Sequence, residues 1–169
     1  DRSGQAQNLD GVVVATTRDP GDQPIVDYCQ GEQIDVIRGD VHDVLDRYYR
    51  AAKARQADVI VRLTGDCPFI DPGVIDLTIK AYLDAQPECD FAANRLPPPW
   101  KRTYPLGLDT EVCSFQALEK DWAEAEEAHQ REHVMPCLYG YQDRFHVIQI
   151  HHPVDYGMLR WTVDTADDL

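Results

Sequence analysis

The chain has 169 residues, of which 43% are hydrophobic and 27% charged, so we expect it to fold around a core of its own. Its 30 acidic residues outnumber its 16 basic residues and give a formal net charge of −14, which argues against a nucleic-acid-binding surface. No apolar run reaches the ~18 residues of a membrane span, the first ten residues are polar, and the five cysteines form no CxxC pair, so we expect a cytoplasmic protein with free thiols.

Short apolar runs alternate with amphipathic segments over the first half of the chain. The runs predict strands at residues 11–17, 34–40 and 57–64, and the segments predict helices at residues 24–32, 41–56 and 71–85. This alternation predicts an α/β fold, a mostly parallel sheet with helices on both faces. Ligands of such sheets bind beyond the carboxyl ends of the strands, so residues that directly follow a strand are the first candidates for function.

The second half of the chain is less regular. Residues 86–110 contain three consecutive prolines among basic residues and predict a semi-rigid loop. After it we expect a strand at 110–115, one helix over 114–133 with Ser114 as its N-cap and an acidic, solvated face, and strands at 144–153 and 158–164.

Two acidic residues follow predicted strands without an evident structural reason. Asp71 precedes Pro72 at a helix start, and Asp168 follows Thr165 at capping-box spacing, so both have capping explanations. Asp66, after Gly65, and Asp164 have none. If their strands are neighbours, the two carboxylates converge on an open site that suits Mg²⁺, which takes its remaining ligands from water and phosphates. The alternative is that each forms an ordinary ion pair or hydrogen bond.

Five segments, in order, resemble the cytidylyltransferases of the spore-coat polysaccharide biosynthesis type, relatives of the acylneuraminate and 3-deoxy-manno-octulosonate cytidylyltransferases. They are "IRGDVHDVLDRYY", "ADVIVRLTGDCPFIDP", "YPLGLDTEV", "REHVMPCLYG" and "LRWTVDTADDL". The resemblance implies a nucleotidyltransferase fold, similar to the nucleotide-binding half of GT-A enzymes. It also implies transfer of CMP from CTP to a sugar or sugar acid, with pyrophosphate released and Mg²⁺ held by Asp66 and Asp164.

The resemblance implies roles for further residues. Arg38, Gly39 and Gly65 would lie along the nucleotide, and the substrate-side candidates are Arg102, Asp109, Arg131, His133 and Arg160. An arginine suits the carboxylate of an acidic sugar because its guanidinium matches the two oxygens. The alternatives are that Arg38 is a surface cation and that His133 is a satisfied core histidine. Residues 86–150 resemble the substrate and dimerisation subdomain of the family, so we expect a homodimer.

The chain departs from the family at its start, where the glycine-, serine- and arginine-bearing loop that cradles the triphosphate is absent. We therefore expect a single domain, residues 1–169, that lacks its first β-loop-α unit and is inactive alone. Two other interpretations stay open: a GT-A-type glycosyltransferase that uses a nucleotide sugar, which the absence of a DxD pair disfavours, and a non-catalytic assembly or binding module.

Overall fold

The computed structural model describes residues 2–140 and 144–168. These residues form two compact units. The first unit combines residues 2–9, 61–113 and 144–168, and the second unit combines residues 10–60 and 114–140. The segment 86–150 contributes to both units, and its expected role in substrate binding or dimerisation stays a prediction.

The second unit begins with a strand–helix–strand segment. The strands β1 (Val13–Thr17) and β2 (Asp35–Gly39) are parallel neighbours, and α1 (Gln23–Gly31) connects them. The helix α2 (Val44–Arg55) follows β2 and begins three residues later than its periodicity predicts. The reason is its cap: the Asp43 carboxylate accepts a hydrogen bond from the backbone N–H of Asp46 at 2.9 Å, which fixes the first turn. The other elements predicted here are confirmed within a few residues.

The remaining part of the second unit consists of α4 (Phe115–Glu124), α5 (Ala128–His133) and α6 (Pro136–Gly140). Ser114 caps α4 as predicted, but the single helix expected over 114–133 is wrong. The chain becomes extended at Ala125, and Glu127 and Gln130 then form a capping box that starts α5. A reciprocal cap of this kind satisfies backbone donors that a continuous helix would not leave free.

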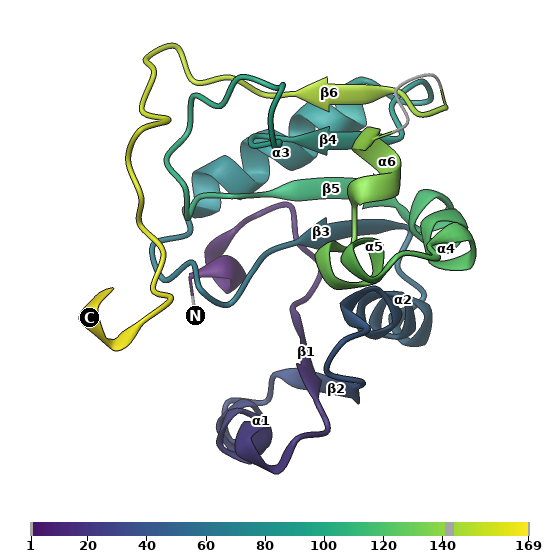
Figure 1. Cartoon of the computed structure of the whole chain (residues 1–169), viewed down its shortest axis with the longest axis vertical. Coiled ribbons are helices and arrows are strands. Elements are labelled where there is room, and N and C mark those ends of the chain that lie inside the picture. The colour runs from purple at the N-terminus through teal and green to yellow at the C-terminus, as the bar shows by residue number, and fades with distance from the viewer. Residues whose placement is uncertain (1, 141–143, 169) are drawn as a thin grey trace. The chain divides into compact units, whose positions relative to one another are not determined.

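Most of a four-stranded sheet belongs to the first unit, and its strands lie in the order β3 (Val59–Arg62), β5 (Glu111–Ser114), β4 (Phe91–Ala93) and β6 (Val147–Gln149) (Figure 1). β4 is parallel to β6 and antiparallel to β5. The helix α3 (Pro72–Asp84) packs against β4, and the side chains of Ile75, Tyr82 and Phe91 are fully or almost fully buried there. The α/β class predicted from the sequence is confirmed.

Two further predictions about the second half of the chain are wrong. The loop expected over 86–110 contains the short central strand β4, whose three residues are completely buried. The segment 158–164 is not a strand of the sheet: within the described residues it forms only an isolated bridge between Leu106 and Arg160, with flanking backbone hydrogen bonds. Too few of its residues pair with one neighbour to make a ladder.

Among the described residues, no helix is both long enough and apolar enough to cross a membrane.

Candidate active site

Asp66 lies in a tight turn directly after β3. The backbone N–H of Cys67 bonds to the carbonyl of Thr64 at 3.4 Å, and Asp71 caps α3 through the N–H of Val74 at 3.1 Å, as predicted. Asp66 is half-buried, and the one hydrogen bond that the described residues give its carboxylate is a weak one from the Cys67 thiol, at 3.7 Å. The turn therefore holds the backbone of Asp66 and leaves most of its carboxylate available to a ligand.

The segment before Asp164 is attached to the same turn. The N–H of Trp161 bonds to the carbonyl of Leu106 at 2.7 Å, and the N–H of Val163 bonds to the carbonyl of Asp66 at 2.9 Å. Gly107 permits this approach: its φ is +105°, and a Cβ there would lie 2.8 Å from the Trp161 backbone. Asp164 therefore directly follows the residue that is bonded to Asp66, although its segment is not a neighbouring strand of the sheet, and the convergence of the two carboxylates stays a prediction.

A dense set of hydrogen bonds surrounds Asp164. Its Oδ2 accepts from the Thr162 hydroxyl at 2.8 Å and from Nη2 of Arg160. The Asp168 carboxylate accepts from the N–H groups of Asp164 and Thr165 at 2.9 and 2.8 Å and from Nη1 of Arg160 at 2.9 Å. The Arg160 guanidinium is the main cause that lowers the pKa of both carboxyl groups. Asp168 caps this turn, as the spacing predicts.

Asp109 is a third carboxylate that interacts with Asp66. Burial raises the pKa of Asp109 to about 6, the Arg95 guanidinium opposes this rise, and the Glu111 and Asp66 carboxylates add to it. Nη1 of Arg95 lies 3.8 Å from Oδ2 of Asp109, and the buried Oδ1 lacks a hydrogen-bond partner among the described residues. Glu111 itself is paired with Arg62 at 2.6 Å. An unpaired buried carboxylate oxygen is costly and marks a place where a donor on a ligand or a water would bind.

The donors at Asp66 and Asp164 fit Mg²⁺. Both are carboxylates, the ligand type that this hard cation prefers, and Mg²⁺ usually keeps several waters or phosphate oxygens beside one or two protein carboxylates. In the part of the chain that the structure describes, no group of three or more His, Cys, Asp or Glu side chains could hold a metal ion. Two carboxylates would leave the other positions on such a cation to water or phosphate oxygens. The assignment of these two residues as metal ligands stays a prediction.

Two predicted substrate-side arginines bind the protein itself in this structure. Nε and Nη2 of Arg102 donate to the carbonyl of Gly157 at 3.1 and 2.8 Å, and Arg160 binds Asp164 and Asp168. Arg102 therefore holds a turn, and a ligand carboxylate would have to use its remaining N–H groups. Their roles toward a sugar stay predictions.

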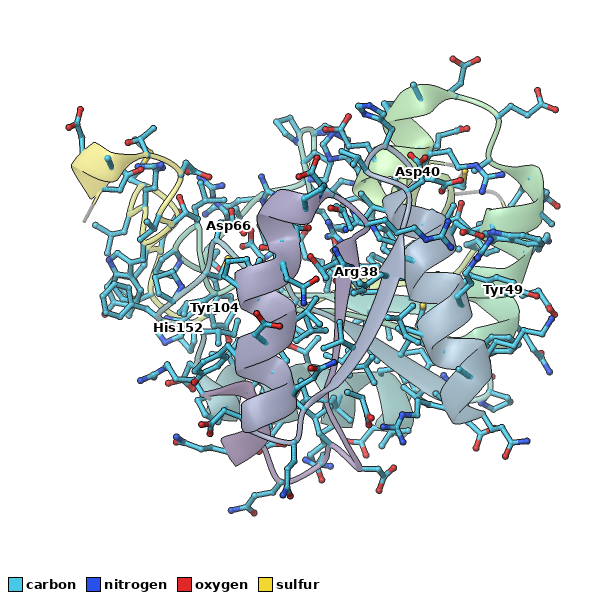
Figure 2. All side chains as sticks on the ribbon, turned by 90° about the horizontal axis from the view of Figure 1, so that it is seen from below. Arg38, Asp40, Tyr49, Asp66, Tyr104 and His152 are labelled. Carbon is cyan, nitrogen blue, oxygen red and sulfur yellow. The ribbon has the colours of Figure 1, made fainter. Side chains whose placement is uncertain are left out.

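The predicted nucleotide-side residues Arg38 and Gly39 lie in the second unit. Arg38 donates to the carbonyl of Thr17 at 2.7 Å, to the Gln23 side chain at 2.8 Å and to the carbonyl of Asp19 at 2.9 Å, so it holds the loop after β1 (Figure 2). A Cβ on Gly39 would lie 2.5 Å from Cγ of Arg47, which gives this glycine a packing reason. Neither observation tests a nucleotide role, but both show that these residues also have structural tasks.

The other substrate-side candidates, Arg131 and His133, lie on α5 in the second unit. Arg131 donates to the carbonyl of Ala125 at 3.0 Å and lies 3.6 Å from the Asp43 carboxylate. His133 is exposed, so the alternative that it is a core histidine is wrong. The next residue, Val134, has a φ of +72° and is completely buried, an arrangement that strains a β-branched residue.

The sequence prediction missed one buried carboxylate, Asp121 on α4. It is 1% exposed, and both of its oxygens lack a partner of hydrogen-bond geometry among the described residues. Burial raises its pKa to about 6, which the nearby Cys137 thiol and Arg131 guanidinium lower in part. The acidic run around it was expected to be solvated, but Asp121 follows the buried Leu118 by three residues, and that spacing placed it on the apolar face.

Comparison with known proteins agrees with the resemblance described above. The cytidylyltransferase family model matches residues 1–158, a range that includes Asp66 and ends before Asp164. An uncharacterized protein of Methanocaldococcus jannaschii is 37% identical over 99% of this chain, and the spore coat polysaccharide biosynthesis protein SpsF of Bacillus subtilis is 31% identical over 96%. The chain spans 66% and 65% of the lengths of these two relatives, just under two thirds.

Two solved structures are also similar to this chain. A cytidylyltransferase from Leptospira borgpetersenii has a TM-score of 0.90 and 32% identity, covering 99% of this chain and 68% of that one. A CMP:2-keto-3-deoxy-manno-octonic acid synthetase complexed with CTP has a TM-score of 0.65 at 15% identity, covering 98% of this chain and 80% of that one, and this likeness concerns the fold. The match over nearly the whole chain shows that this protein belongs to the cytidylyltransferase family.

Proposed function

We propose that this chain carries the metal-binding part of a cytidylyltransferase that transfers CMP from CTP to a sugar or sugar acid and releases pyrophosphate. The observation that carries the proposal is the hydrogen bond between the Val163 N–H and the Asp66 carbonyl, at 2.9 Å, which attaches the residue before Asp164 to the Asp66 turn in a chain of this family. The proposal extends to a homodimer formed through residues 86–150, as the resemblance implies.

In this function the two carboxylates position the nucleotide. Asp66 and Asp164 would hold Mg²⁺, which when bound supplies positive charge to the α-phosphate. Asp66 enters the site from a turn whose backbone is fixed by Val163, and Asp164 enters from a turn that is fixed by Asp168. Phosphoryl transfer of this kind depends on position and charge more than on acid–base chemistry, so a rigid pair of acidic residues is what the reaction requires of the protein.

The acceptor side would use the residues around Asp109. The sugar's attacking oxygen displaces pyrophosphate at the α-phosphorus, and Oδ1 of Asp109 offers an unused acceptor for a sugar hydroxyl. Arg95 and the free donors of Arg102 supply positive charge that a sugar carboxylate would pair with. The proposal therefore favours an acceptor that carries both hydroxyl groups and a carboxylate.

The test is a product assay with CTP, Mg²⁺ and a panel of sugars and sugar acids. It uses this chain and, in parallel, this chain extended at its N-terminus with the phosphate-binding segment of a family member. We expect the extended chain to release pyrophosphate from CTP with an acidic sugar, and its Asp66→Asn variant to lose about 100-fold or more, the scale of removing a main electrostatic contact to the reacting group.

The assay also separates the alternatives. A nucleoside diphosphate as the product of a nucleotide-sugar donor would indicate a glycosyltransferase. No product in either chain, together with no metal-dependent affinity for any nucleotide, would indicate a binding module and would contradict the proposal.

A further inference from the structure

The Arg160 guanidinium occupies the carboxylate that the proposed function assigns to a metal. Its Nη2 donates to Oδ2 of Asp164, and this same oxygen also accepts the Thr162 hydroxyl at 2.8 Å. Nη1 of Arg160 donates to Oδ1 of Asp168 at 2.9 Å. One cation is therefore already placed on the carboxylate, and it is part of the protein.

The turn that presents Asp164 has backbone hydrogen bonds of its own, beside the contact between Nη2 of Arg160 and Oδ2 of Asp168 at 3.3 Å. Oδ2 of Asp168 accepts the N–H of Asp164 at 2.9 Å and the N–H of Thr165 at 2.8 Å, and the N–H of Val163 is bonded to Asp66. These backbone hydrogen bonds close the turn without the guanidinium. The contact between Arg160 and Asp164 therefore adds charge compensation to a turn that other groups already hold.

The contact is also easily exchanged. The side chains of Arg160 and Asp164 are 46% and 50% exposed. Ion pairs at such exposure are weak, because water screens the charges and both side chains lose freedom. A divalent cation that reaches the same oxygen must displace the guanidinium, and the cost of that displacement is small.

We infer that Arg160 is a built-in competitor of the divalent cation: it neutralises Asp164 while the site is empty and leaves that carboxylate when the cation binds. After the exchange, Arg160 retains Asp168 as a partner, so the released side chain stays beside the site. The inference rests on the proposed function, because it takes Asp164 to be a metal ligand. Its consequence is that removal of the guanidinium should tighten metal binding, whereas a purely structural arginine would weaken it.

The experiment measures Mn²⁺ binding to the purified chain by the loss of the free-ion signal in electron paramagnetic resonance, at low ionic strength without nucleotide. Only the part of the binding that Asp66→Asn removes is counted, because a protein with a net charge of −14 collects cations elsewhere as well. We expect Arg160→Gln to bind Mn²⁺ about two- to fivefold more tightly, the affinity change that corresponds to an exposed ion pair. Arg160→Lys, which keeps the charge, should stay close to the original affinity.

Two further variants make the result specific. Arg50→Gln is the matched control: Arg50 forms an ion pair with Asp46 at the same i,i+4 spacing, at 2.6 Å and with 54% of its side chain exposed, and its loss changes the net charge equally. It should leave the Asp66-dependent affinity unchanged. Asp168→Asn should weaken Mn²⁺ binding, because it loosens the turn and weakens the second partner of Arg160, which leaves the guanidinium on Asp164. Thermal unfolding of each variant establishes that it is folded.

An unchanged or weaker affinity in Arg160→Gln would overturn the inference, and so would an equal gain in Arg50→Gln. In both cases the proposed function would stand if Asp66→Asn still removes Mn²⁺ binding. Absence of any Asp66-dependent Mn²⁺ binding in the original chain would overturn the inference and the proposed metal site together.

Discussion

The turns that carry Asp66 and Asp164 differ in how they hold a carboxylate. The Asp66 turn follows a strand, is half-buried, and gives the carboxylate one weak contact from Cys67 at 3.7 Å. The Asp164 turn is exposed and surrounds its carboxylate with Arg160, Thr162 and the backbone donors that Asp168 binds. The first acidic residue is positioned by the fold, and the second is positioned by side chains of its own segment.

Their surroundings also differ in charge. Burial raises the pKa of Asp109 near Asp66 to about 6, whereas the Arg160 guanidinium lowers the pKa of Asp164 and Asp168. The excess negative charge of the half-buried Asp66 and Asp109 side favours a cation that binds there. On the exposed side, Arg160 can leave Asp164 when such a cation binds. In the proposed metal site, Asp66 would therefore offer a carboxylate with one weak contact, and Asp164 a carboxylate whose charge Arg160 compensates.

The attachment between the two turns can be broken at Gly107. Gly107→Ala is expected to lower the free energy of unfolding by about 1–3 kcal/mol, because its φ of +105° and the Trp161 backbone at 2.8 Å both oppose a side chain. The measurement is unfolding in urea.

Gly65→Ala is the matched control, since a Cβ on Gly65 meets no atom within 4 Å. It should change the stability by less than about 0.5 kcal/mol, while CTP binding should weaken if the nucleotide approaches Gly65 as predicted. Equal stability of Gly107→Ala and the original chain would contradict the close packing of residues 106–107 on the segment before Asp164.

The charge on the Asp66 side can be tested by pH. Because the pKa of Asp109 is raised above its ordinary value of 3.8 to about 6, the folded chain favours the protonated group, and stability is lost as pH rises from about 4 to about 6. Asp109→Asn cannot ionise and should remove this loss, so its stability relative to the original chain should rise by about 1–3 kcal/mol between pH 4 and pH 7. Urea unfolding at several pH values measures the slope, and a parallel pH dependence of the two proteins would show that Asp109 is not desolvated.

The Asp164 side should respond to pH with the opposite sign and the smallest effect. The lowered pKa of Asp168 means that its contribution is present above its ordinary pKa of 3.8 and is lost as pH falls below it. Asp168→Asn should therefore melt slightly earlier than the original chain at pH 7, and the difference should shrink at acidic pH. A difference that grows toward acidic pH would mean that the Arg160 and backbone contacts do not stabilise the charged form.

The sequence predicts those parts of the fold that local signals determine. The β-branched run at 11–17, the apolar face of residues 44–55 and the Asp71–Pro72 start of α3 each carry their own pattern, and these elements are confirmed. The residues around each acidic residue also helped. Helix capping explains Asp71 and Asp168, which leaves Asp66 and Asp164 as the candidates without a capping role.

Predictions failed where long-range contacts decide the structure. β4 has only three residues and is a strand because β5 and β6 flank it, which no local period reveals. The segment 158–164 has the apolar pattern of a strand. Its backbone hydrogen bonds go partly to Leu106 and partly to Asp66, so it pairs with no single strand. Arg102 and Arg160 look like free cations in the sequence, and their carbonyl and carboxylate partners become evident only in three dimensions.

The proposed metal-dependent nucleotide site is tested most directly by a calorimetric titration of Mg·CTP into this chain, beside Asp66→Asn and with Mg·ATP and metal-free CTP as controls. We expect binding that requires Mg²⁺, prefers CTP over ATP, and is lost in Asp66→Asn, a variant that keeps the shape of the side chain and removes its charge. Binding that is equal with and without Mg²⁺, or unchanged in Asp66→Asn, would contradict the claim that Asp66 and Asp164 form the metal-dependent nucleotide site.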